Sequence, residues 1–529
     1  MFLKKWSAAS LAIAAVAALC LTQPAAAESK PYVPKITWKK CKDADLDSYG
    51  ARCADVAVPL DHAKPHGKKI TIAISRVKHT VKASKYQGVM FANPGGPGGS
   101  GLWLSTFGDY VPGGAGKAYD WIGFDPRGVG RSKPVVRCDG TYNGYDRPAF
   151  VPTTPEIEQA WFARTTAYTD ACRSRNGAIL DHMTTEDVAR DLDLIRAALH
   201  RPRINYYGFS YGTYLGQVYS TLFPSRVRRM VFDGTVDPRG IWYQNNLDQD
   251  APFDSNVNAW FAWLAQRDAR FHLGDTATEV KDLFYATRDK LDETPVKTKR
   301  GLIGGSEWND TFLWAGYYQG TWTGLADAFS EYVVEGQVRT LAQAYLEASG
   351  YGDDNGYAVY LGVQCTDAPW PTSWEKWSQD NWAIHALAPF ETWANAWFNE
   401  PCRHWPGKAR RPVTVTGAKV KSLLLVNETL DAATPYAGSL EVRRRYPQAS
   451  LVAVKGGRNH SYSLSGNRCV DHPIVSYLRS GALPKRRKGD VADKTCAPLP
   501  LPRPGAQSQR AASRSEPMRL QLQRAGVIR

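Results

Sequence analysis

A serine flanked by two glycines constrains the fold of this chain more than any other feature of its sequence. The run GFSYG at residues 208–212 follows an apolar segment typical of a strand and precedes a helical pattern that continues to Tyr219. Between a strand and a helix, such a run forms a sharp turn that exposes the serine hydroxyl at the amino end of the helix. Glycine and serine are common residues, but this placement makes a chance match the weaker explanation.

Segments typical of strands and helices alternate on both sides of this turn. Short β-favouring runs predict strands at residues 69–78, 88–92, 119–124, 204–207, 229–232, 422–426 and 450–454. A helix is predicted at residues 185–199, where apolar residues recur on one face. This alternation predicts a mostly parallel central sheet with helices on both faces. Together with the turn at Ser210, it predicts the α/β-hydrolase fold.

The alternation stops between residues 241 and 410, where helical patterns are long and strand patterns are sparse. Thirteen of the 18 tryptophans lie between Trp242 and Trp405. A tryptophan-rich helical insertion most often forms a core of its own, although aromatic walls also suit a lid over an apolar pocket. We therefore expect an α/β core in two parts, residues 28–240 and 411–484, interrupted by a helical cap over residues 241–410.

The first 27 residues have the order of a secretory signal peptide. Two lysines precede an apolar run at residues 8–21, and three alanines end at Ala27. This order predicts cleavage near Ala27 and secretion of the mature chain. A span needs roughly 18 apolar residues, so the run is too short to cross a membrane, and no later run is long enough. A buried N-terminal helix is the weaker alternative, and a lipoprotein signal is disfavoured because Leu19 precedes Cys20 where a small residue is expected.

Cleavage near that position leaves eight of the nine cysteines. An even number in an exported chain favours disulfides, and eight cysteines allow 105 pairings. The simplest pairing joins neighbours in sequence: Cys41–Cys53, Cys138–Cys172, Cys365–Cys402 and Cys469–Cys496. The spacing is unlike that of a zinc site, and no H-E-x-x-H motif occurs. We therefore expect neither a metal nor another cofactor.

The formal net charge of +15 raises the question of a nucleic-acid or membrane partner. Eleven basic and three acidic residues lie in residues 485–529, a stretch whose end is rich in Pro, Gln, Ser and Arg. Such a composition predicts a disordered tail. With the two lysines of the signal peptide also set aside, residues 28–484 carry an excess of only five positive charges. This mild excess predicts no nucleic-acid partner. We expect no stable membrane insertion, and a monomer.

The exposed serine predicts nucleophilic chemistry, and a serine hydroxyl needs a general base for it. In the predicted fold the chain order is serine, then an acid, then histidine. His460 follows a late strand in a loop that can reach Ser210, whereas His472 precedes a proline at a helix start and is predicted to lie on the surface. The acid is Asp431 or Glu428, and Asp431 is favoured because it lies in a turn that leads to a helix.

A negatively charged oxygen that forms during such a reaction needs backbone N–H donors. One donor is predicted at Tyr211, directly after the serine, and the other in the loop after an earlier strand. The glycine-rich run at residues 93–101 fits this second place because glycines let the backbone approach a substrate. Gly95 and Gly96 are the two candidates. A phosphate cradle is the weaker reading of this run, which lacks the G-x-x-x-x-G-K-[ST] spacing.

Five motifs occur in the order found in a known family: NPGGPGGSG, GFDPRGVGRS, GFSYGTYLG, LDAATP and GGRNHS. From about residue 50 to 480 the chain resembles secreted α/β-hydrolases of the tripeptidyl aminopeptidase type, which belong with prolyl-aminopeptidase-like serine peptidases. The resemblance implies a triad of Ser210, Asp431 and His460. It also implies release of short peptides from free N-termini through an acyl-enzyme. The related prolyl aminopeptidases carry H-G-G-P-G at the glycine loop, so the choice between Gly95 and Gly96 stays open.

An aminopeptidase must also bind the cationic α-amine of its substrate, which a carboxylate of the cap can do. Asp367 follows a cysteine in a pattern associated with this family and is the predicted partner of the amine. Glu331, Glu335 and Glu391 are the alternatives. A carboxylesterase or lipase with the same triad is the second hypothesis for the function. A binding protein without catalysis is the third, and the complete set of serine, acid, histidine and glycine loop argues against it.

Overall fold

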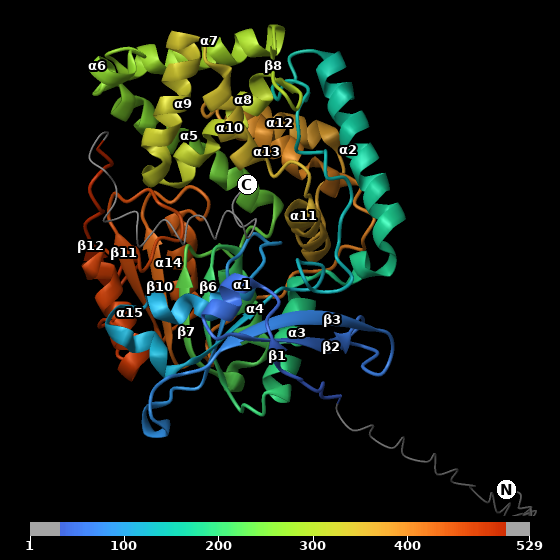
Figure 1. The fold of residues 1–529 in the computed structure, drawn as a ribbon, viewed down its shortest axis with the longest axis vertical. Helices are drawn as coiled ribbons and strands as arrows, with labels where there is room; N and C mark the ends of the chain where they lie inside the picture. The colour runs from blue at the N-terminus through green and yellow to red at the C-terminus, as the bar shows by residue number, and fades with distance from the viewer. Residues whose placement is uncertain (1–31, 504–529) are drawn as a thin grey trace, which may run out of the picture. The chain divides into compact units, whose positions relative to one another are not determined.

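The computed structural model of the chain describes residues 32–503. A ten-stranded sheet has the order β1-β2-β3-β5-β4-β6-β7-β10-β11-β12 (Figure 1). β3 pairs antiparallel with β2 and β5, whereas the strands from β5 to β12 in that order are parallel. This confirms the predicted mostly parallel sheet. The strands are β1 (Lys39–Lys40), β2 (Arg52–Pro59), β3 (Lys69–Val77), β4 (Val89–Asn93), β5 (Asp120–Phe124), β6 (Ile204–Phe209), β7 (Val227–Asp233), β10 (Leu423–Glu428), β11 (Ala449–Val454) and β12 (Lys494–Cys496).

Helices cover both faces of the sheet. Alternate side chains of β6 belong to two hydrophobic clusters, as the pleat of a strand requires. Tyr206 belongs to the cluster that includes α3, α4 and α14, and Tyr207 to the cluster that includes η2, η3 and α15. The helices of this half are α1 (Ala44–Ser48), η1 (Ala83–Lys85), η2 (Leu102–Tyr110), η3 (Pro112–Ala118), η4 (Gly177–His182), α3 (Thr185–Ala198), α4 (Tyr211–Leu222), η5 (Pro224–Arg226), α14 (Tyr436–Arg445) and α15 (Arg468–Ser480).

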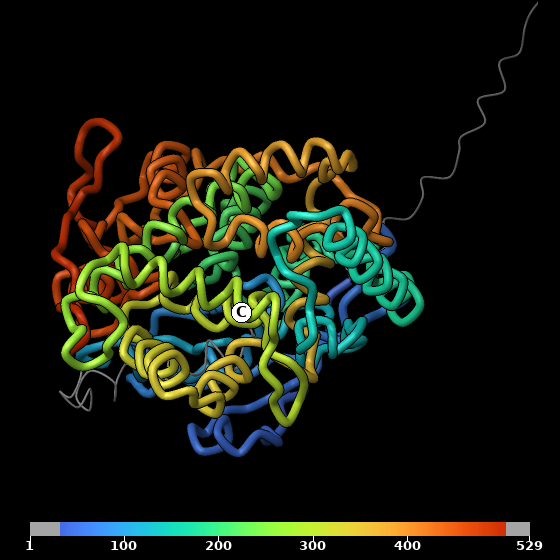
Figure 2. Tube along the Cα trace, turned by 90° about the horizontal axis from the view of Figure 1, so that it is seen from above, coloured from blue at the N-terminus to red at the C-terminus, as the bar shows by residue number. Residues whose placement is uncertain are grey.

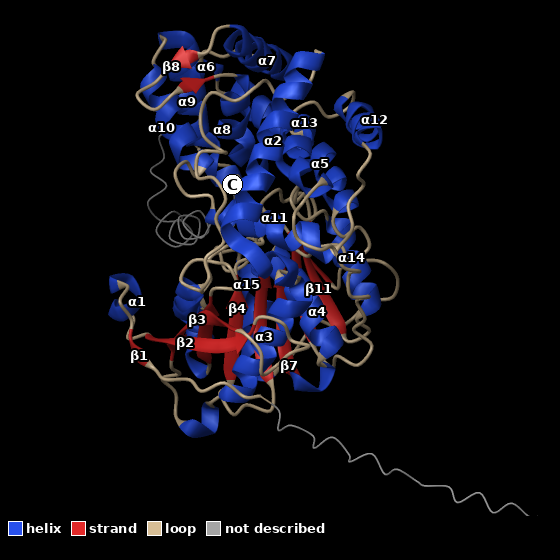
Figure 3. Ribbon diagram, turned by 90° about the vertical axis from the view of Figure 1, so that its right-hand side faces the viewer, coloured by secondary structure: helices blue, strands red, loops and turns tan. Residues whose placement is uncertain are grey.

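Between β7 and β10 the chain is mainly helical, interrupted by the short hairpin of β8 (Val296–Lys297) and β9 (Leu302–Ile303). Figure 3 shows these helices gathered at one end of the molecule and the large sheet at the other. We call them, together with α2 (Pro155–Asn176), the helical layer. Its other members are α5 (Tyr243–Ala265), α6 (Asp268–Phe271), α7 (Ala277–Glu293), α8 (Gly305–Tyr317), η6 (Gln319–Thr321), α9 (Trp322–Glu335), α10 (Val338–Ser349), α11 (Asn355–Asp367), α12 (Trp374–His385), α13 (Thr392–Asn399) and η7 (Glu400–Arg403).

The helix α2 was not predicted, and it extends the helical layer beyond residues 241–410. Figure 2, which looks down on the layer, shows α2 along one side of it. The indole ring of Trp161 on α2 stacks on that of Trp397 on α13, with ring centroids 5.5 Å apart. Phe150 also stacks on the indole of Trp161, with ring centroids 5.6 Å apart. Residues that precede α3 in sequence therefore complete a core inside the helical layer.

The C-terminal region differs from the prediction of a disordered tail over residues 485–529. β12 pairs in parallel with β11, and the Arg443 guanidinium bonds the Asp493 carboxylate at 2.7 Å, with both side chains buried. The indole N–H of Trp263 donates to the carbonyl oxygen of Pro502 at 3.1 Å. The predicted disorder is therefore wrong for residues 485–503, because these contacts anchor the segment to the sheet and the helical layer. Residues 504–529 lie outside the described structure.

All four predicted disulfides are confirmed: Cys41–Cys53, Cys138–Cys172, Cys365–Cys402 and Cys469–Cys496. The last of them ties β12 to α15. The predicted signal peptide, residues 1–27, lies outside the described residues. Within residues 32–503, none of the helices combines the length and the apolar character that crossing a membrane requires.

Candidate active site

Ser210 lies in the sharp turn between β6 and α4, with φ +53° and ψ −128°. A Cβ on Gly208 would lie 2.5 Å from the carbonyl oxygen of Gly212, and a Cβ on Gly212 would lie 2.6 Å from that of Asn93. Larger side chains would therefore force the turn open, which explains both glycines of the motif. The Ser210 N–H donates to the carbonyl oxygen of Asp233 at 3.0 Å, and this bond fixes the turn against β7.

Asp431 and His460 lie together in the loops after β10 and β11. Nδ1 of His460 is 3.0 Å from each carboxylate oxygen of Asp431, and both residues are buried. Asp431 also accepts hydrogen bonds from the N–H groups of Ala433 and Thr434, both at 3.0 Å, and from the Thr434 hydroxyl at 2.7 Å. A carboxylate only accepts hydrogen bonds, so Nδ1 carries the proton and Nε2 is left as an acceptor.

Ser210 and His460 line the same cavity, but no hydrogen bond joins their side chains in the described structure. Nε2 of His460 lies 3.4 Å from the hydroxyl of Ser461. Catalytic hydrogen bonds are often long in a free enzyme and shorten when substrate binds. The structure thus pairs the predicted acid with the predicted histidine and brings the predicted serine to the same cavity. The rejected alternative His472 is exposed on α15.

Two further carboxyl groups are buried beside residues 455–467, which carry His460 and which we call the histidine loop. Oε2 of Glu428 accepts hydrogen bonds from the backbone N–H of Asn459 at 2.5 Å and from its side-chain amide at 3.1 Å. Burial raises the pKa of Glu428 to about 8, and the charges of Asp431 and Asp233 act in the same direction. Burial also raises the pKa of Asp233 to about 6. At this pKa the protonated form of Glu428 is favoured at neutral pH, and its carboxyl group bonds the neighbour of His460, so Asp431 is the better candidate for the acid.

Two candidate N–H donors come from different elements, the glycine-rich loop and the start of α4. Gly96 and Tyr211 line the cavity, as Ser210 does, and Tyr211 begins α4, where an N–H has no partner within the helix. The N–H of Gly95 instead donates to Oδ1 of Asn93 at 3.0 Å, within its own loop. A Cβ on Gly95 would lie 2.9 Å from the Cβ of Ser210, so this glycine is needed for close packing. The two glycine candidates therefore differ: the N–H of Gly95 is engaged within its own loop, and Gly96 lines the cavity.

The cavity has a volume of about 680 Å³, which is ample for a small molecule or a short peptide. Helices of the helical layer line it with side chains three or four positions apart, the spacing of one helix face. Aromatic side chains form much of its wall: Tyr142, Phe150, Trp161, Trp242, Phe253, Trp314, Tyr317, Tyr357, Tyr360, Trp397 and Phe398. The tryptophan-rich segment therefore builds both a core and a cavity wall.

Carboxylates outnumber basic groups along the cavity. Six carboxylates and two arginines line it: Asp237, Asp248, Asp310, Glu347, Asp353, Glu391, Arg147 and Arg239. This balance suits a cationic group on a bound molecule, although the chain as a whole is basic. Within residues 32–503, His, Cys, Asp and Glu side chains form no group of three that could hold a metal ion.

The structure does not support the prediction that Asp367 binds a substrate amine. Its buried carboxyl group accepts hydrogen bonds from the N–H and hydroxyl of Thr185, at 2.6 and 2.5 Å, and from the indole N–H of Trp242 at 3.1 Å. Burial raises its pKa to about 7. Asp367 does not line the cavity, whereas Gln364 on the same helix does. Sequence alone could not give the rotation of α11 that separates these two side chains.

Of the three alternative carboxylates, only Glu391 lines the cavity. Glu331 and Glu335 lie on α9 and are absent from its wall, and Glu331 accepts a hydrogen bond from the Thr340 hydroxyl. Glu391 is 3% exposed and immediately precedes α13.

Three neighbours of His460 were not predicted. The hydroxyl of Thr434 lies 3.2 Å from Nδ1, and a Cβ on Gly234 would lie 3.0 Å from Cε1. The ring of Tyr317 on α8 meets the imidazole edge to face, with centroids 5.8 Å apart. The position of Thr434 three residues after Asp431 is a signal that the sequence does carry. Tyr317 has no such signal, because the long helical insertion brings it to the site.

Comparison with known proteins is consistent with this architecture. Residues 88–290 match the alpha/beta hydrolase fold family, and residues 388–496 match the family of TAP-like proteins. A tripeptidyl aminopeptidase of Streptomyces lividans is 41% identical over 482 residues, which cover 89% of this chain and 88% of that protein. Carboxylesterase B of Mycobacterium tuberculosis is 31% identical over 476 residues, with 85% and 89% covered. The serine protease Hip1 of Mycobacterium bovis is 29% identical over 477 residues, with the same two coverages.

The fold and these relatives define the chain as a serine hydrolase of the α/β-hydrolase class. With 41% identity across most of both proteins, the chain belongs to the tripeptidyl aminopeptidase family. The resemblance inferred from the sequence motifs is confirmed.

Proposed function

We propose that the chain is a secreted serine aminopeptidase that releases short peptides from the free N-termini of peptides or proteins. Ser210 is the nucleophile, His460 is the general base and acid, and Asp431 orients the imidazole. One observation carries this proposal. Ser210 and His460 line a common cavity, and the Asp431 carboxylate lies 3.0 Å from Nδ1 of the histidine.

The reaction follows from the roles of these three side chains. The Ser210 oxygen attacks the scissile carbonyl carbon while Nε2 of His460 takes the hydroxyl proton. The imidazolium gives this proton to the departing amine, the C–N bond breaks, and the acyl group remains on Ser210 as an ester. His460 then deprotonates a water molecule that hydrolyses the ester. Asp431 holds Nδ1–H throughout and stabilises the imidazolium.

Backbone N–H groups stabilise the charge that develops on the substrate oxygen. We assign this role to Gly96 and Tyr211, which both line the cavity beside Ser210. Losing one such donor raises the barrier by about 3 kcal/mol. Gly95 contributes by its shape, because its N–H is engaged by Asn93.

Glu391 is the proposed partner of the substrate α-amine, in place of Asp367. It is buried in the cavity wall, and Asn395 lines the cavity one turn later on α13. The side-chain amide of Asn395 donates to the Asp250 carboxylate at 2.9 Å, so a second carboxylate lies close to this part of the wall. A charge-assisted hydrogen bond to an ammonium group is stronger than a neutral one. The helical layer then acts as the cap that holds the N-terminal end of the substrate.

Secretion is supported by the four disulfides, which are typical of exported proteins. The proposed signal peptide ends near Ala27.

Three substrates test the proposed function: a tripeptide anilide with a free amine, the same anilide N-acetylated, and a short-chain nitrophenyl ester. We expect efficient cleavage of the free-amine anilide alone, and none by the Ser210→Ala variant. Equal cleavage of the acetylated anilide would contradict an aminopeptidase. Turnover by Ser210→Ala would show that the nucleophile is misassigned.

Ester hydrolysis is the second candidate function. It is favoured by the carboxylesterase B relative, which is 31% identical over 89% of its own length, and by the aromatic wall of the cavity. Cleavage of the ester without cleavage of either anilide would establish this alternative.

A further inference from the structure

Two buried asparagines join the helical layer to the loops that carry Asp431 and His460. Asn459 is 3% exposed and immediately precedes His460, and Asn256 is 1% exposed and lies on α5. Neither residue lines the cavity. Both have their polar side-chain atoms engaged on the two sides of the boundary between the helical layer and the sheet.

Asn459 is held by Glu428 on one side and by Gln319 on the other. Its backbone N–H and its side-chain amide both donate to Oε2 of Glu428, at 2.5 and 3.1 Å. Its Oδ1 accepts a hydrogen bond from the backbone N–H of Gln319 at 2.9 Å, and its amide also lies 3.3 Å from Oε1 of Gln319. One side chain therefore connects the end of β10 with the start of η6.

The next residue extends this connection to the imidazole itself. The backbone N–H of His460 donates to the carbonyl oxygen of Tyr317, the last residue of α8, at 3.1 Å. Two successive residues of the histidine loop are thus bonded to the segment between α8 and η6. This segment therefore holds the backbone on which the imidazole is carried.

Asn256 makes a second connection that includes the acid. Its amide donates to the carbonyl oxygen of Leu430, the residue before Asp431, at 3.0 Å and to that of Gly316 on α8 at 2.9 Å. Its Oδ1 accepts a hydrogen bond from the guanidinium of Arg458 at 2.7 Å. Asn256 therefore bonds the loop that carries Asp431, the histidine loop and the end of α8 from a single position.

We propose that Asn459 and Asn256 are positioning residues, through which the helical layer sets the relative placement of Asp431, His460 and Ser210. The helical layer is then part of the catalytic geometry as well as a wall for substrate. The inference rests on the proposed function in that it assigns Asp431 and His460 to the triad. It goes beyond that function by making the layer responsible for the alignment of the triad.

The expected size of the effect follows from the sensitivity of catalysis to placement. A displacement of about 1 Å at a reacting group can lower the rate about 10²-fold. Removing either asparagine side chain deletes its own hydrogen bonds between the loops and the segment from α8 to η6, and leaves buried groups without their partners. The pocket that binds the substrate keeps its lining, because neither asparagine belongs to it.

The first test compares Asn459→Ala and Asn256→Ala with the control Asn381→Ala. Asn381 is also 1% exposed and lies in the helical layer, but its amide bonds the carbonyl oxygen of Trp377 on its own helix. We expect kcat on the tripeptide anilide to fall about 10²-fold in the first two variants, with KM changed less than about three-fold. The pH profile of kcat/KM should also shift. The control should lose thermal stability without either change.

The second test leaves both asparagines in place and removes one of their donors. Gln319→Pro deletes the N–H that bonds Oδ1 of Asn459, together with the weaker acceptor Oε1 that lies 3.3 Å from the Asn459 amide. Gln319 is the first residue of η6, where proline is tolerated. Tyr318 before it is already extended, with φ −144° and ψ +122°, as a residue before proline requires. We expect this variant to fold and to lose part of kcat, so a folding failure of the alanine variants does not end the test.

A substrate-independent readout separates this inference from the proposed function. The rate at which an alkyl fluorophosphonate labels Ser210 depends on activation by His460 and not on the peptide. If the wild type labels rapidly but cleaves no peptide, the proposed function fails while the variants still test the positioning. The inference is wrong if Asn459→Ala, Asn256→Ala and Gln319→Pro all fold and each keeps the labelling rate and the kcat of the wild type.

Discussion

At Gly96 the backbone conformation and the proposed chemistry depend on the same missing side chain. Its φ is +106°, in the region that favours glycine. A Cβ there would lie 2.9 Å from the nitrogen of Gly98, so an alanine must shift the loop and the N–H assigned to the oxyanion. We expect Gly96→Ala to lower kcat about 10²- to 10³-fold while circular dichroism shows a folded protein.

The control for this substitution is Gly489→Ala, far along the chain in the anchored C-terminal segment. Gly489 also has a positive φ, +83°, but a Cβ there would meet nothing within 4 Å. Its substitution should cost about 1 kcal/mol of stability and leave kcat unchanged. Equal kinetics for the two alanine variants would argue that Gly96 does not donate to the oxyanion.

The buried Glu428 carboxyl makes stability depend on pH. Burial raises its pKa from the ordinary value of 4.5 to about 8, with the neighbouring charges of Asp431 and Asp233 contributing. Between these two values the folded protein holds a proton that the unfolded chain releases. The free energy of unfolding therefore falls as pH rises from 4.5 to 8, by at most about 1.4 kcal/mol per pH unit from this group.

Glu428→Gln tests this dependence because glutamine resembles the protonated acid and does not titrate. We expect the melting temperature of the wild type to fall relative to that of the variant between pH 5 and pH 8. Thermal melts of both proteins at several pH values in this range measure the difference. Parallel curves would mean that Glu428 is ionised in the folded protein at neutral pH.

At the scale of elements, α2 shows how a helix outside the predicted cap supports the cavity. Trp161 is 2% exposed, lines the cavity, and stacks between Phe150 and Trp397 at centroid distances of 5.6 and 5.5 Å. Trp161→Ala should lower the free energy of unfolding by about 3–5 kcal/mol. It should also raise KM for short peptides several-fold, because a wall of the cavity is lost.

Trp382→Ala is the matched control for an aromatic contact in the helical layer. Trp382 is 39% exposed on α12 and meets Trp393 edge to face at 5.0 Å, away from the cavity lining. Its loss should cost about 1 kcal/mol and leave KM unchanged. Urea unfolding and steady-state kinetics on both variants give the comparison. If KM changes equally in both variants, the position of Trp161 in the cavity wall does not determine substrate binding.

The parallel strands and the nucleophile turn could be predicted because their signals are local. Short apolar runs and the GFSYG motif need no knowledge of distant contacts. α2 was missed although its buried residues recur at helical spacing, since Thr165 and Thr169 interrupt the apolar pattern. β12 was missed because three residues in a basic segment carry no strand pattern; pairing with β11 and a disulfide hold it in place.

The same limit explains which site residues could be predicted. Asp431 and His460 each follow a recognisable strand, so their motifs and chain order sufficed to select them. Asp367 was selected from a pattern within one helix, and the rotation of that helix turned its carboxyl group toward Thr185. Asn256 and Tyr317 lie in the helical insertion and are far in sequence from the loops of Asp431 and His460 that they contact. Only the packing of the helical layer on the sheet creates them.

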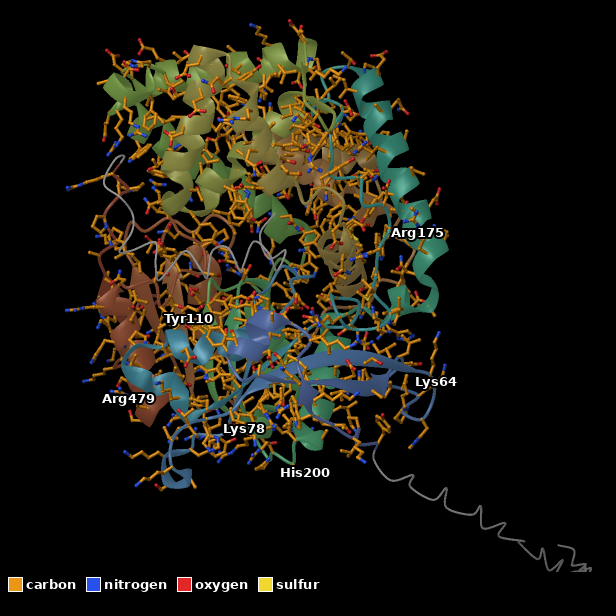
Figure 4. All side chains as sticks on the ribbon, in the orientation of Figure 1. Lys64, Lys78, Tyr110, Arg175, His200 and Arg479 are labelled. Atoms are coloured by element: carbon orange, nitrogen blue, oxygen red, sulfur yellow. A yellow bond between two sulfur atoms is a disulfide. The ribbon has the colours of Figure 1, made fainter. Side chains whose placement is uncertain are left out.

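Across the whole molecule, charge is distributed unevenly. The chain has a formal net charge of +15, yet carboxylates outnumber arginines six to two in the cavity wall. Figure 4 shows basic side chains such as Lys64, Lys78 and Arg479 on the half that contains the sheet. An acidic cavity in a basic protein favours a substrate whose positive charge enters the cavity, which is the situation of a peptide with a free N-terminus.

This distribution predicts that binding of a free-amine substrate weakens with salt. The Debye length falls from about 30 Å at 0.01 M to about 10 Å at 0.1 M ionic strength. We therefore expect KM for the free-amine tripeptide anilide to rise several-fold over this range while kcat stays constant. In Glu391→Gln, KM should already be raised at low salt and should depend less on ionic strength, because one carboxylate partner of the amine is gone. A variant with wild-type KM at both salt concentrations would mean that another of the cavity carboxylates binds the amine.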